Sequence, residues 1–504
     1  VAAKRKYCDR DVLRRIRRST VAKLREEIEP VDMTDYARFL LQWSGIRTVD
    51  SRATSATRAT AHERTAPSIE DTAAALDRLS GFIVPASSTP ALLQVRVPSA
   101  GLGDIDSLLT SGALTWWGHG SLGSKDMTIA WAPSAIAAEV RSMLKGSEPT
   151  PLDQLEPPAV SVIDALSGGG AFDIDAIHAS VVRAGTVVSV ETLEATLWDL
   201  AARGWVTCDS WSAMHARVSG RRRSSTGSIS RAGSRRAGAR SRSPRRTRMV
   251  TRSAGPRWSL AAGARDPSTD ATSITENAAI EYAGIVLERW AVASRVTVAV
   301  EQPVGGFAGQ YRVLSALAEA GTCQRVYAVD GAGGAQFAVT GAVDSLRESA
   351  GDLHPGRYVL SAVDPANPFG TLLPWPSSEP VAGQPAPRPA RRAGALVMLD
   401  GATLRAFAEP SGGAVATWGV ASDDDATELL RDLAAAREPM STRPRALLTS
   451  IDGISLLDGA AISADGSVRW NVAVPRKPAS LPTPRGWRWP EPCLEGGHRS
   501  NLAA

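Results

Sequence analysis

The residues best suited to chemistry are a cluster of glycines between two apolar runs, which reads YAVDGAGGAQFAV at residues 327–339. A glycine loop that cradles phosphates is followed by Lys and then Ser or Thr, because these side chains reach the phosphate oxygens and the bound Mg²⁺. Ala335, Gln336 and Phe337 stand there instead. Two apolar runs around a glycine-containing turn are typical of a β-hairpin, so we expect a hairpin and not a nucleotide site.

Three polar residues near predicted turns are the remaining candidates for catalysis, namely Asp330, Gln336 and Asp364. Turn formation is the ordinary explanation for both acids. No Ser, His and Asp motif and no pair of motif-placed carboxylates can be named, so the catalytic residue stays unknown. The four cysteines stand far apart, and no histidine lies at metal-ligand spacing from a second ligand. This predicts a reducing cytosol and no metal or other cofactor in this chain.

The composition is that of a folded protein with several modules and an uneven charge. With 504 residues, of which 43% are hydrophobic, the chain predicts roughly three to five modules. The formal net charge is only +5, yet residues 210–265 contain 15 arginines and no acidic residue. No apolar run is long enough to span a bilayer, and no signal peptide follows the N-terminus. We expect a cytoplasmic, nucleoid-associated protein without membrane contact.

A short skeleton recurs three times: an apolar residue, a Leu three positions later, and a Gly four positions after that. The apolar pair would lie on one helical face, and the Gly falls where a helix ends in the left-handed conformation. A strand-like run follows each Gly. Helix, strand and hairpin in this order end a winged-helix module, so the repeat predicts such modules in tandem. The three sets are Ile105/Leu108/Gly112, Leu197/Leu200/Gly204 and Leu314/Leu317/Gly321.

The helix before each predicted wing decides whether a module can read bases. A base-reading winged helix carries Arg, Asn or Gln outward on this helix, which enters the major groove. The first helix carries Asp104 and Asp106, the second Glu191, Glu194 and Asp199, and the third Gln310 and Arg312 against Glu319. We therefore expect most of the modules to contact protein rather than DNA.

Residues 9–28 form an amphipathic helical pattern in which basic residues flank or oppose an apolar stripe. We expect a docked helix whose basic outer face contacts nucleic acid. A merely solvated charged face is the alternative, because three glutamates dilute the charge at the far end. The chain begins inside this pattern, which suggests the back portion of something longer. The candidate contacts are Arg14, Arg15, Arg17, Arg18 and Lys23.

Residues 217–257 are rich in Arg, Ser and Gly and have almost nothing to bury. Such a segment cannot offset its ordering entropy, so we expect a disordered basic linker. Its arginines could hold a polyanion through phosphate contacts that weaken as salt rises. A low-complexity spacer is the alternative. The candidate contacts are Arg221, Arg222, Arg223, Arg235, Arg236, Arg245 and Arg246.

Beyond residue 390 the pattern changes to the alternation of strands. Two strands flank a turn at Asp400 and Gly401, another lies near Trp418, and one helix is expected at 426–436. These features predict a small antiparallel sheet or barrel with one helix on it. A proline-rich stretch tethers it to the preceding residues.

Four collinear stretches of the sequence carry a family resemblance. They are KRKYCDRDVLRRIRRSTVAKLREEIEPV, LWDLAARGWVTCDSW, QPVGGFAGQYRVLSALAEAGTCQRVYAVDGAGGAQFAVTGAVDSLR and LSAVDPANPFGTLLPWP. These stretches resemble the large helicase-related proteins (Lhr), in the portion that follows their helicase core. The resemblance runs from about residue 4 to about 450, and it fades past Ile451 apart from TPRGWRW near the end.

The resemblance implies an ATP-dependent 3′-to-5′ DNA helicase, a hydrolase that acts in DNA repair. It also implies single-stranded DNA as partner and self-association through the C-terminal region. ATP and Mg²⁺ belong to the full-length family, because this chain has no Walker A loop and no DEAH-type box. The same region of the family is similar to winged-helix DNA glycosylases, which keeps a lesion-processing module as the alternative function.

The resulting fold class is α+β, with tandem winged-helix modules, a disordered basic linker and a small antiparallel β-sheet or barrel domain. A non-catalytic segment for nucleic-acid binding and oligomerisation is the first functional hypothesis, and a base-excision enzyme is its rival. The expected divisions are 1–48 (basic helical segment from the end of the helicase core), 49–66 (linker), 67–150 and 151–216 (winged-helix-like modules), 217–256 (basic linker), 257–350 (third module), 351–392 (Pro-rich connection), 393–489 (β-rich domain) and 490–504 (tail).

Overall fold

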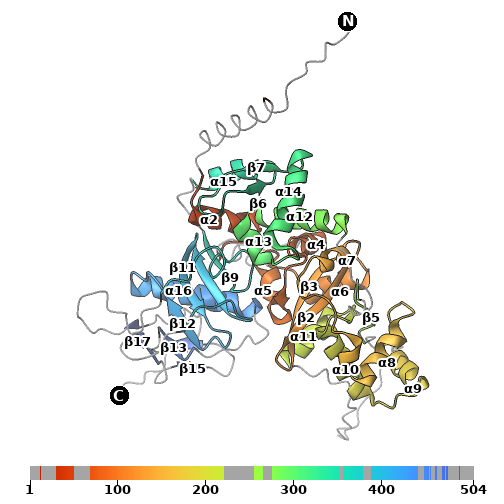
Figure 1. The fold of residues 1–504 in the computed structure, drawn as a ribbon. Helices are drawn as coiled ribbons and strands as arrows, with labels where there is room; N and C mark the ends of the chain where they lie inside the picture. Colours follow the sequence, from red (N-terminus) through yellow and green to blue (C-terminus); the bar gives the residue numbers. More distant parts are fainter. Residues whose placement is uncertain are drawn as a thin grey trace, which may run out of the picture.

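The computed structural model describes residues 30–49, 69–220, 255–264, 275–350, 356–377, 387–440 and 448–452, together with Val12 and five short strand segments between residues 454 and 488. These residues form three winged-helix modules and a β-rich domain that pack against one another (Figure 1). The expected fold class of tandem winged-helix modules and a small sheet domain is confirmed. The candidate contacts between residues 14 and 23 and between 221 and 246 lie outside the described residues.

The first module comprises α4 (Ile69–Asp77), β1 (Val84–Pro85), η1 (Ala86–Ser88), α5 (Thr89–Gln94), α6 (Leu102–Thr110), β2 (Leu114–Leu122), β3 (Asp126–Pro133) and α7 (Ala137–Ser142). Its sheet has the order β1-β3-β2, and β2 and β3 form the wing hairpin. Trp116 of β2 lies opposite Trp131 of β3. Both indoles are buried in a core that the first and second modules share, so these two modules fold against each other.

The second module comprises η2 (Leu152–Gln154), α8 (Pro157–Leu166), α9 (Ile174–Arg183), α10 (Val190–Ala202), β4 (Val206–Cys208), α11 (Trp211–Ser219) and β5 (Trp258–Leu260). Strand β4 pairs with β5 in antiparallel register. Asp209 joins the two strand ends, because its carboxylate accepts from Arg257 N at 2.8 Å and from Arg257 Nε at 2.7 Å. The Arg-rich segment therefore interrupts a hairpin of the second module. The third module was expected to begin at residue 257. In the structure, β5 belongs instead to the second module, because it pairs with β4.

The third module comprises α12 (Glu276–Trp290), β6 (Val292–Ala293), α13 (Arg295–Glu301), α14 (Gly306–Glu319), β7 (Gln324–Val326), β8 (Gln336–Ala338) and α15 (Ala342–Ala350). Its sheet has the order β6-β8-β7. Strands β7 and β8 form an antiparallel hairpin around the glycine cluster, with Gln324 opposite Ala338. The prediction of a hairpin at residues 327–339 is therefore confirmed.

The recurring helix, glycine and strand unit is present in all three modules. Each Gly follows a helix, namely α6, α10 or α14, and precedes a strand. The φ angles of Gly112, Gly204 and Gly321 are 76°, 78° and 84°. Only glycine adopts this left-handed conformation without steric cost, which is why the spacing to the apolar pair marks the helix ends.

The β-rich domain comprises β9 (Arg357–Ser361), β10 (Leu396–Asp400), β11 (Thr403–Ala408), β12 (Ala414–Thr417), α16 (Asp423–Met440), β13 (Ser450–Ile451) and β14 (Ile454–Ser455). The sheet order β14-β13-β12-β11-β10-β9 is open in the described part of the chain, so the barrel alternative is not realised. The β12–β13 pair is parallel, and α16 lies in the long connection that a parallel pair of strands needs. Strand β9 belongs to this sheet, although the sequence placed it in the Pro-rich connection. Two further hairpins pair β15 (Ala460–Ile462) with β16 (Val468–Trp470) and β17 (Ala473–Val474) with β18 (Trp487–Arg488).

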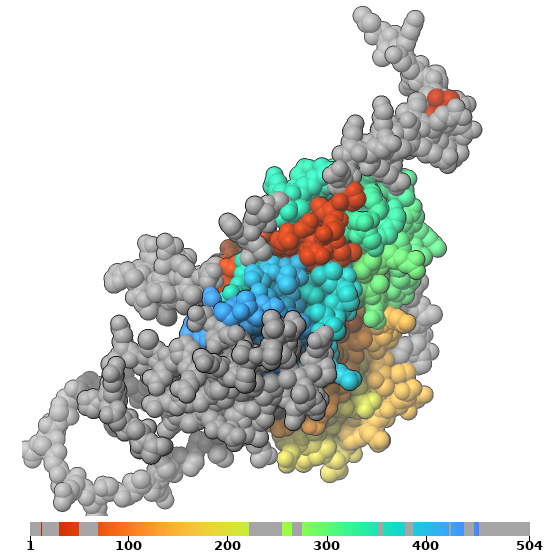
Figure 2. Space-filling view, turned by 90° about the vertical axis from the view of Figure 1, so that its left-hand side faces the viewer, coloured from red at the N-terminus to blue at the C-terminus, as the bar shows by residue number. Residues whose placement is uncertain are grey.

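Helix α2 (Met33–Trp43) lies between the third module and the β-rich domain, as the red surface in Figure 2 shows. Its Tyr36 hydroxyl donates to Trp290 O at 2.7 Å, inside the core of the third module. Leu41 on the same helix belongs to the core of the β-rich domain. Residues near the start of the described chain are thus built into two domains far away in sequence.

Arg96 attaches the first module to the β-rich domain through a buried ion pair. Its Nη1 and Nη2 atoms donate to the two carboxylate oxygens of Asp364 at 2.7 and 2.9 Å, and its Nε donates to Ser44 O at 3.2 Å. The side chains of Arg96 and Asp364 are 4% and 0% exposed. Asp364, a candidate for catalysis in the sequence, is therefore fully engaged in a structural role.

Arg289 of α12 attaches the third module to the first. Its Nη1 atom pairs with the Glu301 carboxylate at 2.5 Å, while its Nε and Nη2 atoms donate to Arg78 O and Ser80 O of the first module. Glu301 also accepts from Tyr282 Oη at 3.1 Å and from Trp290 Nε1 at 2.6 Å. The buried carboxylate is satisfied by several donors, as a buried charge must be.

We predict that Asp364→Asn destabilises the protein by roughly 3–5 kcal/mol, because it leaves the Arg96 cation buried without its counter-ion. The measurement is urea unfolding followed by tryptophan fluorescence. The control is Arg203→Gln, which removes a pair with Asp199 whose side chains are 39% and 51% exposed. Exposed pairs contribute less than about 1 kcal/mol. Equal shifts for the two variants would contradict a structural role for the Arg96–Asp364 pair.

Candidate nucleic-acid interface

The helix before the wing of the first module, α6, packs one side against the protein itself. Asp106 on α6 accepts from Ser212 N of α11 at 3.0 Å and also from the Ser212 hydroxyl. Asp104 accepts from Gly101 N at 2.7 Å and so caps its own helix. Both acids of α6 are therefore occupied by local structure, and the exposed residues of the helix include no cation that could contact a phosphate.

The corresponding helix of the second module, α10, is open to solvent but carries the wrong charge for DNA. Glu191, Glu194 and Asp199 are exposed along it. At its beginning, Val190 is 43% exposed and Val187 is 95% exposed. An acidic helix with apolar side chains at one end suits a protein surface better than a phosphate backbone.

In the third module, α14 presents a single cation to solvent. Arg312 is exposed, whereas Gln310 is 1% exposed and its Oε1 atom has no hydrogen-bond partner. Gln310 therefore cannot read bases, contrary to what its residue type suggested. Among the three helices in the described part of the chain, α14 is the one that combines an outward arginine with a neighbouring hairpin.

The polar residues of the glycine loop hold the third module's hairpin in shape. Gln336 is fully buried, and its Oε1 accepts from Ala328 N and Val329 N, both at 3.0 Å. Its Nε2 donates to Val329 O and Gly333 O. Asp330 accepts from Tyr327 Oη and Gly331 N at 2.9 Å each. Both residues are satisfied within the loop, so the turn-forming interpretation fits the geometry of these two side chains.

Classical nucleophile and metal chemistry has little support in the described residues. Cys208 and Cys323 are free and buried, and burial raises the pKa of the Cys208 thiol to about 12, so this thiol stays protonated. Within the same residues, no group of three His, Cys, Asp or Glu side chains could hold a metal ion. No helix that the structure describes is long and apolar enough to cross a membrane.

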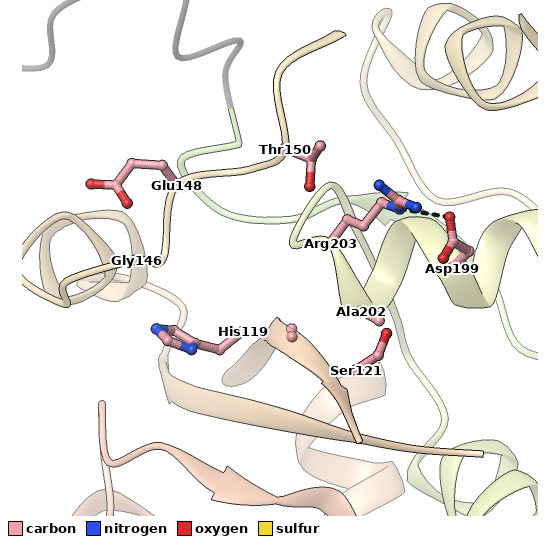
Figure 3. Close-up of a pocket in the computed structure, with 10 residues that line it drawn as sticks. His119, Ser121, Gly146, Glu148, Thr150, Asp199, Ala202 and Arg203 are labelled. Carbon is pink, nitrogen blue, oxygen red and sulfur yellow. Dashed lines mark hydrogen bonds and ion pairs between the residues drawn. The ribbon is translucent and has the colours of Figure 1, made fainter. Parts of the chain in front are cut away.

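A polar cleft lies where the wing of the first module meets the second (Figure 3). The cavity has a volume of about 290 Å³ and is bordered by three segments: the bend of β2 at Gly118–Ser121, the loop at Gly146–Thr150, and the end of α10. No pattern in the sequence predicts this cleft, because its walls come from residues about 80 positions apart with no common motif. Only the three glycines among its lining residues could have hinted at a close approach of backbones.

Both hydrogen-bond donors and hydrogen-bond acceptors line this cleft. His119 Nε2 lies 3.0 Å from Lys145 O, so a neutral imidazole carries its proton on Nε2 and leaves Nδ1 as an acceptor. Across the cleft, Arg203 Nε donates to Asp199 Oδ2 at 2.7 Å, as the dashed line in Figure 3 shows. The ten lining residues include the imidazole ring of His119 but no Phe, Tyr or Trp. The cleft can bind polar groups, but no Phe, Tyr or Trp ring lines it to stack on a flipped base.

Arg141 joins segments that border the cleft. Its guanidinium donates to Ser147 O at 2.9 Å, Gly204 O at 2.7 Å and Ala262 O at 3.0 Å, which belong to three separate segments. Burial lowers the pKa of Arg141 to about 10, and the nearby Glu148 acts in the opposite direction. The group remains cationic at neutral pH, so its charge is balanced mainly by carbonyl dipoles.

The fold defines a protein of tandem winged-helix modules, and comparison with known proteins identifies the family to which these modules belong. Models of the third and fourth winged-helix domains of large helicase-related proteins match residues 31–134 and 272–357. The chain belongs to the large helicase-related family, and the resemblance seen in the sequence is confirmed.

Two curated relatives align with most of the chain. "Lhr helicase/ probable uracil glycosylase" of Mycolicibacterium smegmatis is 33% identical over 90% of this chain, and "Lhr helicase/uracil glycosylase" of Escherichia coli K12 is 31% identical over 88%. The aligned region spans 28% of the length of either relative. Among solved structures, the Streptomyces sahachiroi DNA glycosylase AlkZ aligns with 84% of this chain and 100% of its own, at 14% identity and a TM-score of 0.43, which is too low to establish a shared fold.

We predict that Gly118→Ala separates the first and second modules. A Cβ atom at this position would lie 1.9 Å from Ala201 O, a backbone atom of α10 that cannot move without the helix. The expected cost is about 1–3 kcal/mol or more in the free energy of unfolding. Limited proteolysis and urea unfolding measure it.

The matched control is Gly103→Ala in α6, where a Cβ atom would meet nothing within 4 Å. This variant should be neutral or more stable by up to about 1 kcal/mol, because alanine favours the helix. A Gly118→Ala protein as stable as the Gly103→Ala protein would show that the close approach of β2 and α10 is not required.

Proposed function

We propose that this chain is the nucleic-acid-binding winged-helix region of an Lhr-type ATP-dependent helicase that moves 3′ to 5′ on DNA and acts in repair. The observation that supports this most directly is the pair of family matches, which fall on the first and third modules of one continuous assembly. The proposal gives this chain a binding role and leaves ATP and Mg²⁺ to the full-length protein, since the sequence has no Walker A loop.

The Arg-rich segment is the proposed source of affinity. Residues 221–254 contain twelve arginines and no acidic residue, and they join the two strands of the second module's hairpin. A wing is the part of a winged helix that lies against the nucleic-acid backbone, so an arginine-rich insertion there suits phosphate contact. The proposed contacts include Arg221, Arg222, Arg223, Arg235, Arg236, Arg245 and Arg246, with Arg14, Arg15, Arg17, Arg18 and Lys23 as a second basic group.

Self-association is a further part of the proposal. The beginning of α10 exposes Val187 and Val190 beside Glu191, and Val182 on α9 is 45% exposed. Apolar side chains of this kind are costly to leave in water when they are grouped. We propose that this region meets protein, either a second copy of the chain or another part of the helicase.

Base excision is the second candidate, because the names of both curated relatives include uracil glycosylase. A glycosylase must place a carboxylate or amide against a flipped base in a closed pocket. Asp364 and Gln336 are fully engaged elsewhere, and the cleft at His119 has no Phe, Tyr or Trp in its lining. A uracil-containing oligonucleotide treated with the chain and then with alkali tests this candidate, and an unbroken strand would eliminate it.

We predict that replacing residues 221–254 by a Gly/Ser linker of equal length weakens binding to single-stranded DNA at least about tenfold, because phosphate contacts release counter-ions. The replacement removes twelve positive charges, so the formal net charge falls from +5 to −7. Fluorescence anisotropy at two salt concentrations measures both the affinity and its salt dependence. The replacement keeps Arg217 and Arg257, which bond to Ser124 O and to the Asp209 carboxylate.

A variant in which the same twelve arginines are replaced by glutamine, with the rest of the segment intact, separates the effect of charge on binding from the effect of sequence. Equal losses in both variants would assign the effect to charge. Unchanged binding and an unchanged salt dependence would contradict a role for the segment and would leave the folded modules or the basic helix as the binding site. A native urea unfolding midpoint in both variants confirms that the modules remain folded.

A further inference from the structure

One surface of the third module combines two arginines and an aromatic ring. The Arg325 guanidinium on β7 stands over the ring of Tyr311 on α14, 5.7 Å from the centroid. Arg312 follows Tyr311 on the helix and is exposed, as are Gln324 and Arg325 on the strand. We call these four residues, Tyr311, Arg312, Gln324 and Arg325, the Tyr311 face. Figure 1 shows α14 and β7 together at one end of the molecule, away from α8 and α9.

The core of the module holds Tyr311 in place. Its ring lies 5.8 Å from the buried Phe337 ring in an edge-on arrangement and 6.1 Å from the Phe307 ring. Phe337 lies opposite Arg325 in the β7–β8 ladder, so one residue supports the aromatic ring and positions the arginine's strand. The cation and the ring are thus fixed by packing and by strand register rather than by a flexible loop.

The two arginines are available to a ligand. Neither Arg312 nor Arg325 forms an ion pair with any residue that the structure describes. By contrast, the exposed Arg203 and Arg257 are each paired with an aspartate. Unpaired arginines beside an aromatic ring offer phosphate contacts and a flat cation on which a base can stack.

The same surface is poorly suited to reading a duplex. Gln310, the amide on α14 that could contact base edges, is buried, and the exposed residues of the helix around Arg312 are Ala308 and Ala316. Direct readout in the major groove needs several outward polar side chains. Stacking on an arginine plane instead needs bases that are not paired. The geometry therefore favours single-stranded nucleic acid.

We propose that the Tyr311 face binds single-stranded nucleic acid, with Arg312 contacting phosphate and the Arg325 guanidinium stacking against a base. The inference rests on the proposed function, and it names the folded surface that takes part beside the Arg-rich segment. Because α10 is acidic and α6 carries no basic residue, this face is the one of the three helix and wing surfaces that can accept a polyanion among the described residues.

The test compares the full chain with the double variant Arg312→Gln/Arg325→Gln by fluorescence anisotropy on a labelled oligothymidylate of about 20 nucleotides. We expect the affinity to fall about five- to tenfold and the slope of log K against log salt to become shallower by roughly 0.7, which corresponds to the one phosphate contact of Arg312 on a single strand. The comparison is repeated after residues 221–254 are replaced by Gly/Ser, so that the segment cannot mask the effect. Arg183→Gln, an exposed arginine on α9, is the matched control and should change affinity less than about twofold.

Arg325→Lys separates stacking from charge. The ammonium keeps the positive charge but has no planar surface, so the salt slope should stay while the affinity falls about threefold. If the unmodified chain does not bind, the proposed function itself fails. If it binds and the double variant keeps both affinity and slope in both backgrounds, only the assignment to the Tyr311 face fails. Binding to blunt duplex that is equal to single-strand binding and equally lost in the double variant would overturn the single-strand preference.

Discussion

Buried guanidinium groups that donate to carbonyl oxygens at helix ends set the arrangement of the whole assembly. The last carbonyls of a helix have no partner within it and carry the negative end of its dipole. Arg96 donates to Ser44 O at the end of α2, Arg141 to Gly204 O just beyond α10, and Arg289 to Arg78 O and Ser80 O just beyond α4. Every one of these contacts has a partner in the first module, which is therefore joined to the other three units. An arginine suits this position because it stays charged when buried and has five donors in a fixed plane.

Joining the modules in this way determines which surfaces remain for a ligand. The shared tryptophan core brings α11 onto one side of α6, and the exposed residues of α6 include no cation. The second module's α10 is left with its acids toward solvent, while its other end contributes to the cleft at His119. The third module keeps both its helix and its hairpin open. The three winged-helix modules therefore expose different surfaces, and these differences come from packing as much as from residue type.

The sequence predicted what depends on neighbours along the chain. The apolar pair and the glycine of each unit mark a helix end, because a left-handed residue there needs glycine, and Gly112, Gly204 and Gly321 all show it. The glycine cluster at 331–334 was interpretable as a hairpin for the same local reason. The partner of Asp364, the burial of Gln310 and the insertion of α2 into the third module were not predictable, because each depends on residues more than a hundred positions away or on the packing of an entire helix. The cleft at His119 was not predictable either, because none of the three segments that border it has a recognisable motif.

The charge of the chain is divided unevenly between the Arg-rich segment and the rest of the protein. Residues 210–265 carry fifteen arginines against a net charge of +5, so the remainder of the chain carries a net charge of −10. A polyanion would be repelled by this remainder at long range and attracted by the inserted segment. The β4–β5 pairing and the Asp209–Arg257 contacts hold both ends of that segment at the second module, the module whose own helix is acidic. The insertion therefore supplies basic sequence beside a module whose own helix is acidic. In the binding mode that we propose, a small, local group of cations such as Arg312 and Arg325 positions a strand that the insertion attracts.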